Sequence, residues 1–168
     1  MTARLQLDLP MVLPEVPGVD DTCVERLLVA VEECGRGVEE AHVVDGAVGE
    51  SARVCIHYDA QEFSWPDIRR ALEDSGECLM HRYGHLLVTA EKSAFSAEDM
   101  AEYLEPMEGV LDAAASAGLV RVEFERAKTG EAAIRAALEE MESRAEGTRA
   151  HGLCDATLGS YEDHEDGG

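Results

Sequence analysis

Along the first half of the chain, the spacing of hydrophobic positions switches several times between the two-residue repeat of a strand and the repeat of about 3.6 residues of a helix. Residues 5–9 alternate apolar and polar side chains, as a strand with one buried face does. Residues 22–33 place Leu27, Leu28 and Val31 on one helical face, behind acidic residues suited to capping a helix. The remaining predicted elements of this half are strands at 38–44 and 53–58, a helix that Ser64 caps and Gly76 ends, and a fourth strand at 78–83.

The second half repeats most of this order. A strand is predicted at 86–90, and Ser96 caps a helix that reaches Leu104. Two strands at 110–115 and 119–124 form a hairpin, and the last helix starts near Thr129. From about residue 143 the periodicity is lost and Gly, His and acidic residues accumulate, which indicates a disordered tail or linker.

Two pairs of segments show that the chain contains a duplication. The sequence VCIHYD (54–59) precedes IRRALE (68–73), and VRVEFE (120–125) precedes IRAALE (134–139) at the same spacing. A repeat of about 70 residues is typical of a duplicated small domain. We therefore predict an α+β protein made of two tandem ferredoxin-like βαββαβ sandwiches and a flexible acidic C-terminal tail. The predicted divisions are domains at 1–82 and 83–144 and a tail at 145–168, with a junction short enough for the two domains to pack together.

The excess of acidic residues limits which partners the protein can bind. The formal net charge is -22, from 36 acidic and 14 basic residues. Such a surface repels nucleic acids and anionic membranes, and suits a cation-handling protein or adaptation to high salt. The chain has 5 cysteines, an odd number at irregular spacing, which favours a reducing cytosol. No apolar run approaches the roughly 18 residues that a membrane-spanning helix needs. We predict a cytoplasmic protein. The alternative is a protein located at the cytoplasmic face of the membrane.

Cys23 is the first candidate for chemistry. It falls in the first turn of a predicted helix, at the exposed tip of the domain, where the helix dipole favours a thiolate. Asp20 and Asp21 precede it, and thiolate with carboxylate suits Zn²⁺ or Cd²⁺ better than Cu⁺. The alternative is that Cys23 is an ordinary small helix residue and that both aspartates only cap the helix.

Four further residues are weaker metal candidates. Cys55 and His57 share one face of a strand, and His42 on the neighbouring strand can join His57. Packing in the core or at an edge is the alternative for this group. In the tail, His164 lies among acidic residues that can gather a divalent cation loosely, or that are simply solvated.

The segment GVDDTC (18–23), followed by VERL, resembles the metal loop of heavy-metal-associated domains, whose usual pattern is Gly-Met-x-Cys-x-x-Cys. Residues 54–59 and 65–76 resemble that family's third strand and second helix. The whole chain is similar to the tandem N-terminal cytosolic region of a zinc- or cadmium-type heavy-metal-translocating P-type ATPase. Asp20 stands where the family has its first cysteine and Val19 where it has methionine, and Phe95 takes the place of Cys23 in the second copy. The resemblance therefore implies a degenerate first metal loop and a ligand-free second domain.

We expect a heavy-metal-binding or regulatory module of metal-ion transport, holding Zn²⁺ or Cd²⁺ weakly through Cys23 with Asp20 or Asp21. The chain lacks a P-loop, a nucleophile elbow and a His-Glu-x-x-His helix, so it is predicted not to be an enzyme. Its expected partner is a heavy-metal transporter or its membrane domain, without nucleic-acid binding or membrane insertion. The alternatives are an interaction module of a transporter that binds no metal, and a small-molecule-sensing regulatory domain.

Overall fold

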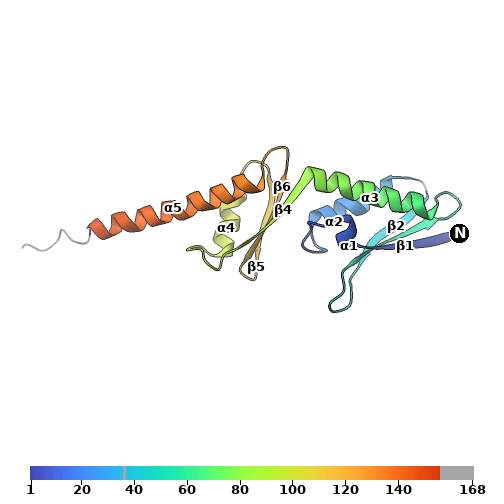
Figure 1. Cartoon of the computed structure of the whole chain (residues 1–168), viewed down its shortest axis with the longest axis horizontal. Coiled ribbons are helices and arrows are strands. Elements are labelled where there is room, and N and C mark those ends of the chain that lie inside the picture. The colour runs from blue at the N-terminus through green and yellow to red at the C-terminus, as the bar shows by residue number, and fades with distance from the viewer. Residues whose placement is uncertain (36, 156–168) are drawn as a thin grey trace, which may run out of the picture.

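The computed structural model describes residues 1–35 and 37–155, an α+β chain with two three-stranded antiparallel sheets (Figure 1). The first unit consists of β1 (Thr2–Asp8), α1 (Leu9–Val12), α2 (Thr22–Glu33), β2 (Val38–Val44), β3 (Arg53–Asp59) and α3 (Trp65–Arg82). The second unit consists of β4 (Tyr83–Thr89), α4 (Ala97–Leu104), β5 (Val110–Ser116), β6 (Leu119–Glu125) and α5 (Glu131–Asp155). Within the described residues, no helix combines the length and the apolar character needed to cross a membrane.

Both sheets have the same topology. The strand orders are β1-β3-β2 and β4-β6-β5, so the last strand of each unit lies in the centre of its sheet. The registers also correspond, with Leu5 opposite Ile56 in the first sheet and Leu86 opposite Val122 in the second. The repeat in the sequence is therefore a repeat of structure.

Helices cover one face of each sheet, and the two cores lie beneath them. Val54, Ile56 and Tyr58 of β3 point into the first core, and Val120, Val122 and Phe124 of β6 point into the second. Because side chains alternate along a strand, the residues between them face the opposite side of the sheet. We call this opposite side the helix-free face.

The predicted fourth strand at 78–83 is wrong. Helix α3 runs through Gly76 to Arg82, and Tyr83 starts β4 of the second sheet directly. Gly76 does not end the helix because it serves packing: an added Cβ there would collide with the carbonyl oxygen of Val12. The missing side chain lets α1 lie against the α3 backbone, and this contact offsets the low helix propensity of glycine. Each sheet consequently has three strands instead of the four of a βαββαβ unit.

The predicted start of the tail also needs correction. Helix α5 continues to Asp155, so residues 145–155 are helical, whereas 156–168 lie outside the described residues. Arg135 pairs with Glu131, and Arg144 with Glu140, each one helical turn apart. Such pairs support a solvent-exposed helix whose apolar periodicity has faded.

The two units are in direct contact. The helix-free face of the second sheet is turned towards the start of α2, and α4 and α5 lie on the far side of that sheet (Figure 1). Tyr83 packs in the core of the first unit, although it belongs to the second sheet. Arg126 of the second unit pairs with Glu15 and donates to the carbonyl oxygens of Met80 and Tyr83. The start of α2 is thus enclosed between the units.

Candidate metal centre

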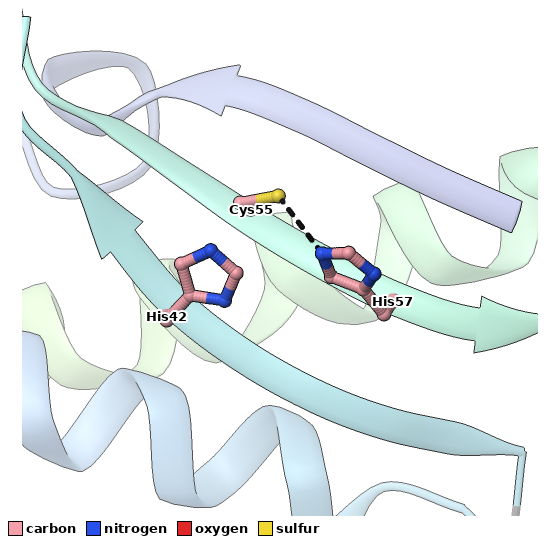
Figure 2. Close-up of side chains that lie close together, drawn as sticks. All are labelled: His42, Cys55 and His57. Carbon is pink, nitrogen blue, oxygen red and sulfur yellow. Dashed lines mark hydrogen bonds between the residues drawn. The ribbon is translucent and has the colours of Figure 1, made fainter.

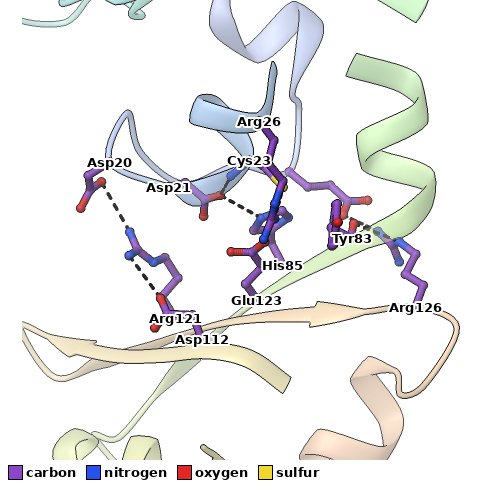
Figure 3. Close-up of polar contacts among 11 residues, drawn as sticks. Asp20, Asp21, Cys23, Arg26, Tyr83, His85, Asp112, Arg121, Glu123 and Arg126 are labelled. Carbon is purple, nitrogen blue, oxygen red and sulfur yellow. Dashed lines mark hydrogen bonds and ion pairs between the residues drawn. The ribbon is translucent and has the colours of Figure 1, made fainter. Parts of the chain in front are cut away.

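Four side chains converge where the units meet: Asp21, Cys23, His85 and Glu123, here called the interunit cluster. Each offers one ligand atom, and all four atoms lie within 4.8 Å of one another. Asp21 caps α2 and Cys23 occupies its first turn, whereas His85 of β4 and Glu123 of β6 are register partners on the helix-free face (Figure 3). Each unit therefore contributes two residues.

Asp21 is held by contacts to both units. Its Oδ1 accepts a hydrogen bond from the backbone N–H of Cys23 at 2.9 Å and lies 3.2 Å from His85 Nε2. Burial raises the pKa of Asp21, but the hydrogen bonds with His85 and Cys23 and the nearby charges of His85 and Arg121 lower it further, so the net shift is downward. Asp21 is accordingly a carboxylate at neutral pH.

Cys23 is fully buried, and its Sγ lies 3.6 Å from Glu123 Oε1. Burial, followed by the charge of Glu123, raises the pKa of the thiol to about 12, although Arg26 opposes the shift. The expected exposed thiol with a lowered pKa is therefore wrong. The helix dipole favours the thiolate, but the second unit removes water from the sulfur, and this desolvation is larger. At neutral pH Cys23 is therefore a protonated thiol.

Arg26, one helical turn after Cys23, neutralises the cluster. Its Nη1 pairs with Glu123 Oε1 and lies 3.5 Å from Cys23 Sγ. The guanidinium also stacks over the ring of Tyr83, 4.1 Å from the ring centroid. Burial lowers the pKa of Arg26, but the hydrogen bond and charge of Glu123 and Cys23 raise it overall. Glu123, which is only 3% exposed, thereby has a counter-ion inside the interface.

The two ring nitrogens of His85 differ, because Nε2 lies against Asp21 and Nδ1 is unpaired among the described residues. The side chain of His85 is 2% exposed, and its Nδ1 has no hydrogen-bond partner among the described residues. A buried polar atom without a partner costs about 1–3 kcal/mol, so such atoms are rare unless a ligand uses the site. Imidazole nitrogen, thiolate and carboxylate oxygen together form a donor set for borderline divalent ions such as Zn²⁺.

A second group, here called the sheet cluster, consists of His42, Cys55 and His57 on the helix-free face of the first sheet (Figure 2). Cys55 Sγ is 3.6 Å from His57 Nε2, and the rings of His42 and His57 stack with centroids 5.4 Å apart. Among the described residues, His42 Nδ1 has no hydrogen-bond partner, and the nearby Glu40 Oε1 is 3.6 Å away. The three ligand atoms lie within 4.8 Å of one another, so this cluster can also hold a soft or borderline cation.

Not every predicted ligand lies in a cluster. Asp20 is 77% exposed, and its carboxylate faces Arg121 at 3.5 Å instead of the thiol. His164 lies outside the described residues. The second domain, predicted to be ligand-free, contributes His85 and Glu123 to a group that could hold a metal, and the prediction itself stays untested.

The sequence contained one signal for Glu123. In the aligned repeats VCIHYD and VRVEFE, Glu123 takes the place of His57, so both copies carry a candidate ligand at the same position of the central strand. No local motif marks His85 or Arg26 as part of a site.

Comparison with solved structures finds a protein that is similar to this chain in sequence and in fold. The structure of the N-terminal extension from Cupriavidus metallidurans CzcP is 34% identical in sequence, with a TM-score of 0.73. The match covers 83% of this chain and 96% of that chain. This chain belongs to the family of the CzcP N-terminal extension. The match spans nearly all of that extension and most of this chain, so the similarity includes both units.

The other comparisons add little to this assignment. The N-terminal soluble domains of Bacillus subtilis CopA are 17% identical over 84% of this chain and 90% of that chain, with a TM-score of 0.31, which is too low to support an argument. No protein-family model and no curated protein matches the chain. The sequence predicts an N-terminal region, and the relative in the CzcP-extension family is one.

Proposed function

We propose that the chain is a cytoplasmic metal-binding regulatory module of a heavy-metal transport ATPase. The interunit cluster carries this proposal, because it brings a thiol, an imidazole and two carboxylates within 4.8 Å of one another inside a buried interface. Membership in the CzcP-extension family supports the link to transport.

Zn²⁺ and Cd²⁺ are the proposed ions. Cu⁺ prefers sulfur ligands alone, and Mg²⁺ and Ca²⁺ prefer oxygen ligands alone. The interunit cluster offers one sulfur, one imidazole and two carboxylates, and the sheet cluster offers one sulfur and two imidazoles. Both mixtures match the preferences of borderline and soft divalent ions.

Binding at the interunit cluster would join the two units through the metal. Asp21 and Cys23 would hold the ion from the first unit and His85 and Glu123 from the second. The ion would displace the thiol proton of Cys23, which burial keeps in place in the metal-free protein. The proposed output is therefore a change in how firmly the units are joined, sensed by the membrane domain of the transporter.

We assign no catalytic step to this chain. Its residues bind and position an ion, and ATP hydrolysis and transport belong to other parts of the proposed ATPase. A metal-independent interaction module remains the second candidate. The net charge of -22 favours it, since so acidic a surface can dock on a basic partner without any ion.

Titration of the whole chain with Zn²⁺ and Cd²⁺, followed by calorimetry and metal analysis, tests the proposal. We expect two ions per chain. Cys23→Ser should remove the interunit ion and Cys55→Ser the sheet ion, because each substitution replaces the single sulfur of its cluster. Cys34→Ser is the matched control, since Cys34 is exposed and belongs to neither cluster.

Other results would favour the second candidate. If both cysteine variants bind as much metal as the unaltered chain, neither cluster is a metal site. If the chain binds no stoichiometric metal but associates with the transporter's membrane domain, the metal-independent interaction module is the better description.

A further inference from the structure

The positively charged side chain of Arg26 already contacts the interunit cluster. The guanidinium of Arg26 pairs with Glu123 Oε1 and lies 3.5 Å from Cys23 Sγ, two of the four atoms that would bind a metal (Figure 3). Glu123 is almost entirely buried, and a buried carboxylate needs a counter-ion. In the metal-free protein Arg26 fills this role.

A divalent ion bound to Glu123 Oε1 and Cys23 Sγ would compete with this guanidinium for both atoms. Two cations within a few ångströms repel strongly in a site that excludes water. Arg26 Nη1 contacts both Glu123 Oε1 and Cys23 Sγ, and these two atoms lie only 3.6 Å from each other, so an ion between them would meet the guanidinium. Metal binding is therefore an exchange in which the ion enters, the guanidinium leaves, and the thiol proton passes to solvent.

The neighbours of Arg26 make this exchange feasible. Its side chain is 30% exposed and rests on the face of Tyr83, so it has a path to water. Asp21 and His85 have no comparable freedom, because their side chains are 1% and 2% exposed. The most exposed side chain of the group is thus the one that is not a candidate ligand.

We propose that Arg26 is an intramolecular competitor that sets the metal concentration at which the interunit cluster fills. This inference rests on the proposed function and deepens it. By occupying Glu123 and Cys23, Arg26 lowers the apparent affinity, so the cluster responds only when the ion is abundant. Both states link the units, through the Arg26–Glu123 pair without metal and through the ion with it.

Zn²⁺ affinity measured in competition with a chromophoric chelator tests the role of Arg26. All proteins are full-length and carry Cys55→Ser and His57→Ala, so that only the interunit cluster binds. We expect Arg26→Gln to tighten Zn²⁺ binding by about tenfold or more, within the range common for coupled ligands. Arg26→Lys, which keeps the charge, should stay close to the parent. Arg126→Gln is the matched control, because it removes an arginine that links the units but lies outside the cluster.

The failures of the two proposals can be told apart. If the parent binds Zn²⁺ at this cluster and Arg26→Gln binds equally or more weakly, Arg26 supports the ligands and the competition is overturned, while the proposed function stands. If neither protein binds Zn²⁺, both proposals fail at this site. In the unaltered chain, the Nε–H resonance of Arg26 should shift on Zn²⁺ addition, and an unchanged resonance would likewise overturn the exchange.

Discussion

The sulfur of Cys23 lies in the first turn of a helix and yet has no access to water. The helix start would activate an exposed thiol, but burial and the nearby Glu123 raise the pKa to about 12. Nucleophilic and oxidative chemistry require the thiolate. The metal-free protein thereby protects this sulfur from alkylation and oxidation while keeping it next to its proposed co-ligands.

This protection predicts a large difference in reactivity among the cysteines. During brief iodoacetamide treatment at pH 8, Cys34 and Cys78 should be alkylated because both are exposed, whereas Cys23 should remain unmodified. Peptide mass spectrometry measures the modified fraction at each position, and treatment in urea provides the fully reactive reference. Modification of Cys23 as rapid as that of Cys34 would contradict the enclosed interface.

Helix α3 shows what sequence patterns can and cannot predict about an element. Strand β2, the start of α2 behind Asp21 and the start of α3 behind Ser64 all follow from alternation and capping, which depend on neighbours along the chain. The end of α3 does not, because Gly76 is retained in the helix by a tertiary contact with α1. Helix α1 itself is missed because Pro10 suggests a loop, whereas here it occupies the first turn of a helix.

Gly76 predicts an unusual response to alanine. Glycine to alanine within a helix normally stabilises a protein by up to about 1 kcal/mol. At Gly76 the new Cβ would also come within 2.6 Å of Val12 Cγ1, so we expect Gly76→Ala to destabilise the protein by about 1–3 kcal/mol. Urea denaturation measures both effects, with Gly147→Ala in α5 as the matched control, since nothing lies near its Cβ position. Stabilisation by both substitutions would show that α1 does not pack tightly on α3.

Sequence patterns predict only two of the four residues of the interunit cluster as candidate ligands. Asp21 and Cys23 stand out because a short acidic segment with a thiol at a helix start is a local pattern. His85 and Glu123 join them through the folding of β4 and β6 into one sheet and its docking on the first unit. Sequence spacing carries no information about that docking, so it does not show that these two residues meet Asp21 and Cys23.

For the whole molecule, the main electrostatic fact is the net charge of -22. Like charges repel across the compact state and oppose folding. Three arginines lie where the units meet, and Arg26, Arg121 and Arg126 each pair with an acid of the opposite unit. The interface is therefore held in part by attraction within a molecule that is otherwise self-repelling.

This balance predicts the response to salt. Raising NaCl from about 0.01 to 0.1 M shortens the Debye length from roughly 30 to 10 Å, which screens the long-range repulsion more than the close pairs. We expect the melting temperature, followed by circular dichroism, to rise by a few degrees. Choline chloride should act equally, which would exclude specific sodium binding. A falling melting temperature would mean that the ion pairs between the units outweigh the repulsion.

The duplicated central strand places a candidate ligand at the same position in both copies, His57 in the first and Glu123 in the second. The two clusters differ in which unit supplies their other residues. All residues of the sheet cluster come from the first unit, whereas the interunit cluster takes two residues from each unit. An ion bound at the sheet cluster would therefore require only the first unit to be folded. An ion bound by all four residues of the interunit cluster would require both units to be folded and docked on each other.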